Sequence, residues 1–399
     1  ADGRAVLRSS VREFLAQELM HALGIPTSRS LTLYVSETEI IRRPWYTEGS
    51  KYFEPDIMVD NHAAITTRVA PSFLRVGQLE LFARRVRGNS HDNALSELKI
   101  IVQHLIDRNY RNDINPSHSF NEKVIKLAYL YRERLVSLVA NWMRVGYCQG
   151  NFNSDNCAAG GFTLDYGPFG FCELFDPRFQ PWTGGGEHFS FFNQPFAAEI
   201  NFKMFCSSLL PLLLENNEDI EKLEIIKNDF SKFMSKEMQL MWTKKLGLEK
   251  YDETLTNELF NLMANSKADF SIFFRKLSHI PDNISFLKDS FYLPSTKDLD
   301  KKWFIWLKKW QDCIKKQGNY KEISKSMKQV NPKFTWREWM IVPAYEEAEE
   351  GNYSKIKELQ TIFKNPYEEQ SLETDQKYNR LRPREFFNKG GISHYSCSS

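Results

Sequence analysis

The most constraining feature of this chain is the stretch from Gln149 to Gly167, which reads QGNFNSDNCAAGGFTLDYG. It places Asp155 and Asn156 side by side in a short polar loop and a second acid, Asp165, in a D-Y-G turn. Mg²⁺ is a small, hard cation that takes one or two protein oxygen ligands together with phosphate oxygens. Asn156 and Asp165 would suffice as protein ligands, so the stretch predicts a site for ATP and its metal.

The residues before and within this stretch predict its secondary structure. Ser119 and Glu122 have the spacing of a capping box, and apolar residues recur every three or four positions from Val124 to Trp142, which predicts a long helix. The segment 162–165 has the pattern of a short strand. The order helix, loop, strand and D-Y-G turn is that of a kinase-like large lobe. The alternative is two polar turns, because Asn, Asp, Gly and Pro dominate turns.

The N-terminal region predicts the end of a small mixed lobe. Leucines and other apolar residues between Leu7 and Leu23 recur at helical spacing and stop at Gly24 and Pro26, the usual order for a helix end. The segments 31–35 and 64–69 are short and rich in β-branched residues, so two strands are expected after the helix.

Composition limits the class of protein. With 399 residues, 42% hydrophobic and 14% aromatic, the chain can bury a large core in more than one packing unit. No apolar run reaches the roughly 18 residues of a membrane span, and a net charge of +2 is too small to indicate a nucleic-acid partner. The six cysteines lack C-x-x-C spacing, which favours free thiols over structural zinc. They are Cys148, Cys157, Cys172, Cys206, Cys313 and Cys397.

The second half differs from the first in composition. Only four lysines precede residue 200, whereas the second half is rich in lysine and predicts helices, with a boundary near 216–222. The segment 282–300 is the best linker candidate. We therefore expect an α+β fold in three parts: the remainder of a kinase-like N-lobe at 1–80, a mostly helical kinase-like C-lobe at 81–220, and an all-helical C-terminal extension at 221–399.

The kinase pattern is incomplete at one position. Protein kinases place a catalytic Asp five residues before the metal-binding Asn, and this position is Asn151 here. A neutral amide cannot accept a proton from an attacking hydroxyl, so ordinary phosphotransfer loses its base. Asp155 is the nearest carboxylate that could replace it.

Several separated blocks resemble one family. They are DGRAVLRSSVREFLAQELMHALGIPTSRSL, TRVAPSFLRVGQLE, NSDN followed by LDYGPFGF and FDP, FFNQPFA, NPKF and the terminal SCSS. In this order they resemble selenoprotein O, a family of kinase-like protein adenylyltransferases. The resemblance implies transfer of AMP from ATP, bound in a flipped orientation, to Ser, Thr or Tyr hydroxyls of proteins. It implies Asp155 as the catalytic proton acceptor, and Asn156 and Asp165 as ligands of Mg²⁺, with Mn²⁺ as an alternative.

The same resemblance implies further site residues. Arg68 and Arg75 match phosphate-binding arginines, whose planar guanidinium groups suit phosphate oxygens; without the family both would be surface or salt-bridging residues. Asp2 and Gly3 match residues that contact the nucleotide, together with Asp165.

Glu13 matches a helix glutamate that pairs with an upstream lysine. That lysine and a Gly-rich segment would precede residue 1, so we expect an N-terminally truncated chain of weak activity. Cys397, third from the end, stands where other members have selenocysteine, and it is a redox candidate or an inert thiol. His394 occupies the position of a second cysteine and excludes a local C-x-x-C disulfide. Relatives imply a mitochondrial location for a eukaryotic source and a cytoplasmic one for a bacterial source.

Two other functions stay open. A conventional protein kinase would transfer the γ-phosphate instead of AMP. A catalytically inactive pseudokinase would act as a scaffold or redox partner, and its function would depend on Cys397 but not on Asp165. The expected partners are ATP and hydroxyl-bearing protein substrates, without nucleic acid or a membrane span.

Overall fold

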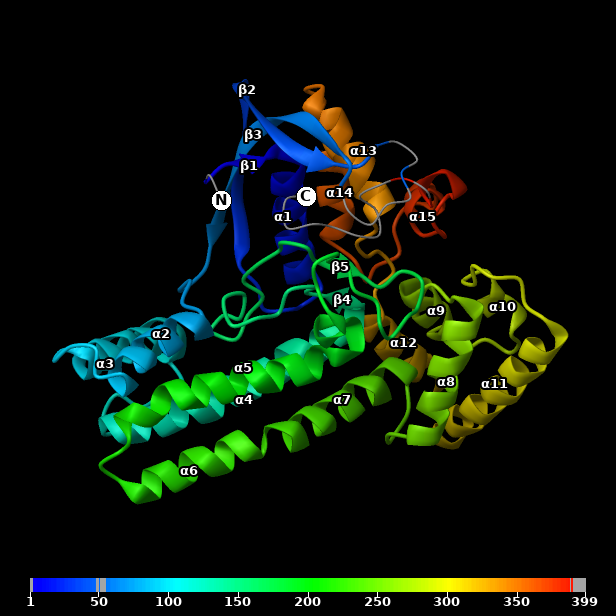
Figure 1. Cartoon of the computed structure of the whole chain (residues 1–399). Coiled ribbons are helices and arrows are strands. Elements are labelled where there is room, and N and C mark those ends of the chain that lie inside the picture. Colours follow the sequence, from blue (N-terminus) through cyan, green and yellow to red (C-terminus); the bar gives the residue numbers. More distant parts are fainter. Residues whose placement is uncertain (1–2, 48–49, 51–54, 388, 390–399) are drawn as a thin grey trace.

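The structure is a computed structural model that describes residues 3–47, 50, 55–387 and 389. It combines small β-sheets with many helices, so the predicted α+β class is confirmed. A three-stranded sheet and the helices beside it form the upper part in Figure 1, and long helices form the lower part. In the described chain after residue 196 only helices and loops occur, apart from single β-bridges, as the sequence predicted.

The strands, in chain order, are β1 (Ala5–Val6), β2 (Arg29–Trp45), β3 (Ile57–Val69), β4 (Tyr147–Cys148) and β5 (Gly170–Phe171). The helices of the first half are α1 (Leu7–Ala22), α2 (Val76–Arg87), α3 (Ala94–Leu105), α4 (Phe120–Val145) and α5 (Gln194–Leu209). Those of the second half are α6 (Asn217–Asn228), α7 (Phe230–Leu246), α8 (Glu253–Ser266), α9 (Phe270–Leu277), α10 (Ser285–Lys288), α11 (Lys297–Gln317), α12 (Tyr320–Val330), α13 (Glu338–Glu349), α14 (Ser354–Phe363) and α15 (Leu372–Tyr378).

The upper sheet is antiparallel and has the order β1-β3-β2. Strands β2 and β3 form a long hairpin whose register runs from Arg29 opposite Val69 to Trp45 opposite Ile57. Its pairing shifts between Val35 and Ile40, where the alternation seen in the sequence also ends. The two predicted strands are confirmed as parts of these longer strands.

Helix α1 is the predicted N-terminal helix, and it lies between two layers. It contacts β2 and β3 on one side and α13 and α14, from the end of the chain, on the other (Figure 1). Because both sides are covered, even Arg8, Arg12 and Gln17 are buried. Gly24 follows with a φ of +77°, which glycine adopts without strain.

Helix α4 is the long helix that leads into the polar loop. Ser119 and Glu122 form the predicted capping box, with the Ser119 amide donating to Glu122 Oε2 at 2.7 Å. Gly146 ends the helix at a φ of +82°, and a Cβ there would lie 2.9 Å from the Phe270 ring. Helix α4 packs against α5, α6 and α7, so the loop after it starts from a rigid support.

Two predictions of local structure were wrong. The segment 162–165 is not a strand, because only Thr163 forms β-bridges there. The segment 282–300 is not a linker, because it contains α10 and the start of α11, and Leu287 and Phe291 are buried in it.

The core consists of two main clusters that run through the chain. The first joins residues between Leu7 and Tyr378, and the second joins residues between Ala140 and Met327. The division at residues 80 and 220 stays a prediction. No helix in the described ranges is long and apolar enough to span a bilayer. The five cysteines that the structure describes are free thiols, and four of them are buried.

Candidate active site

The polar loop closes on itself where its two ends meet. Cys157 and Thr163 form an antiparallel β-bridge, so Asn156, just before the bridge, and Asp165, just after it, flank the same point. Thr163 also pairs with Thr27, in the segment that follows α1. The bridge therefore brings the backbone next to the two predicted metal ligands together and attaches it to the segment that follows the N-terminal helix.

Side-chain amides order the first half of this loop. Asn153 Oδ1 accepts hydrogen bonds from the backbone N–H groups of Asp155 at 2.9 Å and Asn156 at 3.2 Å. Asn156 Nδ2 donates to the carbonyl of Asn151 at 2.8 Å. This bond directs the amide nitrogen into the loop, and Oδ1 is at the opposite end of the same amide group. The carboxylate of Asp155 is exposed. The polar-turn alternative thus describes the local geometry correctly, because this is an Asx-type turn.

The start of α2 runs along the loop and needs a glycine. The N–H groups of Val76 and Gly77 donate to the carbonyls of Cys157 at 2.9 Å and Ser154 at 3.0 Å. A Cβ on Gly77 would lie 2.3 Å from Asp155 Oδ1. Sequence reasoning missed Gly77, although it stands in the TRVAPSFLRVGQLE block, near the start of a helix where glycine is unfavourable.

Arg68 joins α1 to the D-Y-G turn. Its Nη1 lies 3.1 Å from Glu13 Oε1 and donates to the carbonyl of Leu164, the residue before Asp165, at 2.9 Å. Glu13 was expected to pair with a lysine upstream of residue 1, and the partner that the structure describes is Arg68. The pair is about three-quarters buried, with 26% and 27% of the side-chain surfaces exposed.

The charges of the site act on one another. The pKa of Glu13 is raised above its usual value by burial, and the negative charge of Asp165 raises it further, while Arg68 opposes both. Asp165 Oδ2 accepts from the N–H of Gly167 at 3.1 Å. Gln149, which is buried, holds the backbone of the same acid by donating to its carbonyl at 2.9 Å. Gln149 was also missed, since a single glutamine carries no motif.

The other predicted residues are placed as follows. Arg75 precedes α2, and its backbone forms a β-bridge with Ala158. Its Nε is buried and has no hydrogen-bond partner in the described chain. Gly3 is exposed at a φ of +73°, and a Cβ there would meet no atom within 4 Å. Asp2 and Cys397 lie outside the described residues.

The donors at the loop fit a hard divalent ion. Asn156 Oδ1 and the Asp165 carboxylate are oxygen ligands of the kind Mg²⁺ takes, and phosphate oxygens and water complete its shell. No group of three or more His, Cys, Asp or Glu side chains with metal-binding geometry occurs among the described residues. A site that depends on the nucleotide for its remaining ligands needs no such group.

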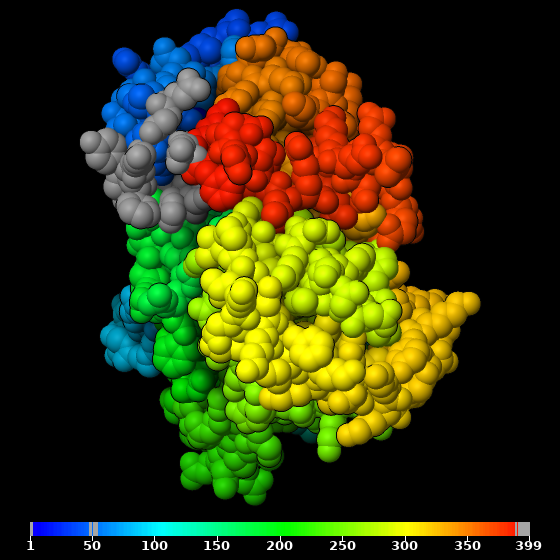
Figure 2. All heavy atoms as spheres, turned by 90° about the vertical axis from the view of Figure 1, so that its right-hand side faces the viewer, coloured from blue at the N-terminus to red at the C-terminus, as the bar shows by residue number. Residues whose placement is uncertain are grey.

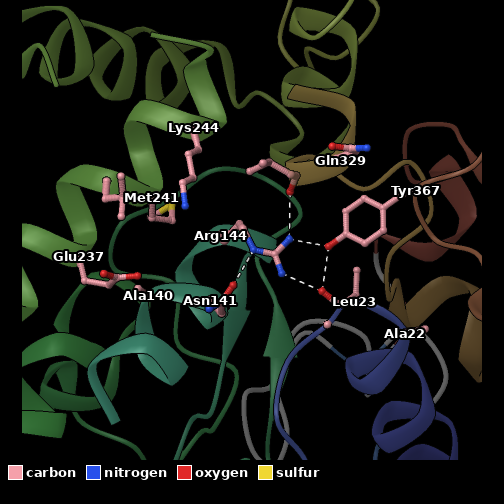
Figure 3. Close-up of a pocket in the computed structure, with 13 residues that line it drawn as sticks. Ala22, Leu23, Ala140, Asn141, Arg144, Glu237, Met241, Lys244, Gln329 and Tyr367 are labelled. Atoms are coloured by element: carbon pink, nitrogen blue, oxygen red, sulfur yellow. Dashed lines mark hydrogen bonds between the residues drawn. The ribbon is translucent and has the colours of Figure 1, made fainter. Parts of the chain in front are cut away.

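A cavity of about 420 Å³ lies elsewhere, between the end of α1 and helices α4, α7 and α12. Figure 3 shows Arg144 reaching across it toward carbonyl and side-chain oxygens. Its guanidinium donates to Asn141 Oδ1 at 2.8 Å, Leu23 O at 2.8 Å and Val330 O at 3.0 Å. Because these bonds occupy the guanidinium, Arg144 joins three elements structurally, and the cavity contains none of the predicted site residues.

Comparisons with known proteins identify relatives of the whole chain. The family described as "Protein adenylyltransferase SelO" matches residues 1–364. "Protein nucleotidyltransferase YdiU" of Aromatoleum aromaticum is 34% identical, and the match covers 100% of this chain and 74% of that protein. Proteins of the same name from Flavobacterium johnsoniae and Rhodopirellula baltica are 34% and 30% identical, covering 100% of this chain and 74% and 75% of their own lengths.

These matches define the class first and then the family. The class is that of enzymes that transfer a nucleotide to protein, so the predicted nucleotidyltransferase is confirmed. The chain belongs to the SelO family of protein adenylyltransferases. The three relatives are bacterial, and nothing in these matches supports a mitochondrial location or the pseudokinase alternative.

Proposed function

We propose that this chain transfers AMP from ATP to Ser, Thr or Tyr hydroxyls of proteins and releases pyrophosphate, in a cleft between kinase-like lobes. The lobes would follow the predicted division, with a small lobe at 1–80, a large lobe at 81–220 and a helical extension at 221–399. The observation that carries the proposal is Arg68, which links Glu13 of α1 to the carbonyl beside Asp165. That contact joins the N-terminal helix to the D-Y-G turn in one charged site.

Asp155 is the proposed proton acceptor. Its carboxylate is exposed beside the start of α2, where a protein hydroxyl can reach it within hydrogen-bond distance. The hydroxyl oxygen bonds to the α-phosphorus, the bond from that phosphorus to the bridging oxygen of the β-phosphate breaks, and pyrophosphate leaves. The hydroxyl proton passes to Asp155. Asn151, a neutral amide, has no part in this proton transfer.

Asn156 and Asp165 are the proposed ligands of Mg²⁺, with Mn²⁺ as an alternative. When bound, such an ion offsets negative charge on the phosphate oxygens. The loop holds Asn156 through its Nδ2 and the turn holds Asp165 through Gly167 N–H, so both side chains are oriented before the ion binds.

Arg68 and Arg75 are the proposed phosphate ligands. The ion pair with Glu13 and the hydrogen bond to Leu164 both use Nη1 of Arg68, and the guanidinium also lies 5.7 Å from the centre of the Phe73 ring. A guanidinium group carries five N–H donors in all, so donors remain for phosphate. The Nε of Arg75 has no hydrogen-bond partner among the described residues, which leaves this donor available. Asp2 and Gly3 as nucleotide contacts and Cys397 as a redox residue stay predictions. The bacterial relatives favour the predicted cytoplasmic location over the mitochondrial one.

The position of the label on the product tests the reaction. We expect ATP labelled on the α-phosphate, but not on the γ-phosphate, to label the protein or an added protein substrate, with a mass increase of one AMP. Asp155→Ala and Asp165→Ala should each lower the rate at least about 100-fold, the scale of losing one catalytic group. Asp92→Ala, an exposed acid outside the site, is the matched control. Labelling from the γ-phosphate would instead indicate a kinase.

A further inference from the structure

A second cavity, of about 500 Å³, lies in the helical C-terminal part of the chain. It is bounded by the loop after α9 and by helices α11 and α12, in the part of the molecule that projects to the right in Figure 1 and faces the viewer in Figure 2. No residue of the proposed active site lines it. Its volume is in the range of small-molecule sites.

The lining of this cavity is strongly basic. Lys308 and Lys315 lie two turns apart on one face of α11, and Lys321 of α12 also lines the cavity. Asp282 is the one acidic residue in this lining. None of the three ammonium groups has a carboxylate partner within the described ranges. By contrast, Lys309 next to Lys308 is paired with Glu258 at 2.7 Å. Like charges brought together without counter-charges are unfavourable unless an anion joins them.

The wall opposite α11 is held in a strained shape. Ile280 has a φ of +52°, which is costly for a β-branched residue and typical of ligand sites when it occurs. Gln311 Nε2 of α11 donates to the carbonyls of Pro281 at 2.8 Å and Asp282 at 3.2 Å. Ser324 Oγ of α12 donates to the carbonyl of Ser278 at 2.6 Å. Both helices therefore hold the loop in place through hydrogen bonds, so the shape of the cavity does not depend on a bound ligand.

His279 adds an imidazole to the lining of this cavity. The pKa of its imidazole lies below the usual value because the ring is partly buried, and the charges of Lys328 and Arg275 lower it further. Its ring packs against Phe286 at 5.8 Å between ring centres. A neutral imidazole and the Tyr320 phenol add hydrogen-bonding groups to a site whose charge comes from lysines.

We propose that this cavity binds a small anion that carries two or more linked phosphate groups, either as inorganic polyphosphate or as part of a nucleotide. Lysine ammonium groups on flexible stems bind phosphate as point charges, without the fixed geometry of an arginine fork. Three lysine ammonium groups around one cavity match the charge of several linked phosphates better than the charge of a single phosphate. The site is separate from the proposed active site and does not depend on its function.

Calorimetric titration with inorganic tripolyphosphate tests this proposal. The double variant Lys315→Gln/Lys321→Gln should weaken binding at least tenfold. The control Lys301→Gln/Lys325→Gln removes the same charge from the same two helices but outside the cavity, and should change affinity less than twofold. These lysines are exposed, so the fold should persist in both variants. Arg75→Ala, at the proposed ATP site, should leave this binding in place.

Three results would show that this cavity is not the binding site, and a fourth would contradict the expected kind of ligand. They are the absence of tripolyphosphate binding to the unaltered chain, equal weakening in the cavity and control variants, which would indicate general attraction to basic helices, and loss of all binding in Arg75→Ala. Inorganic monophosphate that binds as tightly as tripolyphosphate would contradict the expected multiple charge. A failure of AMP transfer would leave this result unaffected, because the binding measurement does not involve the reaction.

Discussion

Gly77 positions the proposed base by close contact, and within the described residues no hydrogen bond to the Asp155 carboxylate is found. Gly77 lies in α2 with its Cα against Asp155, and an added Cβ would come 2.3 Å from Oδ1. Backbone bonds from Val76 and Gly77 fix this approach. The carboxylate is at the end of an exposed side chain and can rotate away, whereas the α2 backbone cannot easily move.

Gly77→Ala should therefore displace the Asp155 side chain without unfolding the chain. We expect the rate of AMP transfer to fall about 10- to 100-fold, since a displacement of about 1 Å at a reacting group has this scale. The melting temperature should change little, because alanine favours a helix more than glycine does. Initial rates with labelled ATP measure the first effect and thermal unfolding measures the second.

Gly88→Ala at the other end of α2 is the matched control, because no carboxylate is among the atoms nearest to a Cβ there. An unchanged rate in Gly77→Ala would contradict the proposed position of the base.

Sequence spacing predicted part of this site for a local reason. Asp155, Asn156 and Asp165 are close in the chain, so a single loop brings them together. The ion pair of Glu13 and Arg68 spans β2 and β3 and depends on how the sheet packs on α1. The resemblance supplied both residues but not their contact with each other. Gly77 was missed because its role is defined only by a partner 78 positions away.

At the level of elements, the same distinction between local and distant causes applies. The helices at 7–22 and 120–145 could be predicted because caps, apolar spacing and glycine stops are local signals. The expected strand at 162–165 failed because one β-bridge at Thr163 gives no regular pattern. The sequence underestimated the lengths of β2 and β3. Many of their side chains are exposed, so the alternation of apolar and polar residues is missing over much of each strand.

Helix α7 carries a buried lysine that the sequence did not indicate. Lys245 is 1% exposed, and its Nζ donates to the carbonyl of Arg144 and to Asn331 Oδ1, each at 2.9 Å. The pKa of this ammonium group is well below its usual value, because of burial and then the positive charge of Arg144. In the unfolded chain the group titrates near pH 10.4.

This difference in pKa predicts a pH dependence of stability. Between the lowered pKa of the folded state and about pH 10.4, the unfolded chain binds more protons, so the contribution of Lys245 to stability increases with pH, by up to about 1.4 kcal/mol per unit. The free energy of unfolding of the unaltered chain should therefore rise relative to Lys245→Met from pH 7 to pH 10. Urea denaturation of both proteins measures it.

Lys244→Met, one residue earlier and exposed, should show no such trend relative to the unaltered chain. A constant difference for Lys245→Met across the same pH range would mean that the group titrates normally in the folded chain.

Across the whole molecule, the end of the chain returns to its beginning and to the segment after the D-Y-G turn. Helices α13 and α14 pack on α1. Arg337, just before α13, binds both carboxylate oxygens of Asp269 at 2.6 and 2.8 Å, and Glu173 at 3.2 Å. Arg382 binds Glu173 from a fourth segment at 2.6 Å. These four side chains are at most 8% exposed, so one buried ion network joins segments that composition had assigned to separate parts.

Arg337→Leu tests whether this network holds the segments together. The change leaves the buried Asp269 without its bidentate partner and removes one of the two arginines that pair with Glu173, which keeps Arg382 and the hydrogen bonds from Tyr292 and Trp339. We expect the free energy of unfolding to fall by about 3–5 kcal/mol. Arg337→Lys should lose less, since it keeps the charge but not the planar fork. Arg380→Leu, an exposed arginine nearby, is the control and should change stability by less than about 0.5 kcal/mol.

The pH dependence separates this network from simple packing. Burial favours a raised pKa for Glu173, but Arg382 and Arg337 outweigh it, and the pKa lies below the usual value. Such a carboxylate stabilises the fold above its unfolded pKa of about 4.3, and this contribution is lost as the pH falls below that value. The deficit of Arg337→Leu should therefore be similar from pH 7 to about pH 5 and become smaller as the pH falls from about 4.3 toward about 3. A deficit that is the same near pH 7 and near pH 3 would mean that Arg337 acts through its volume, and that the chain is joined by apolar packing alone.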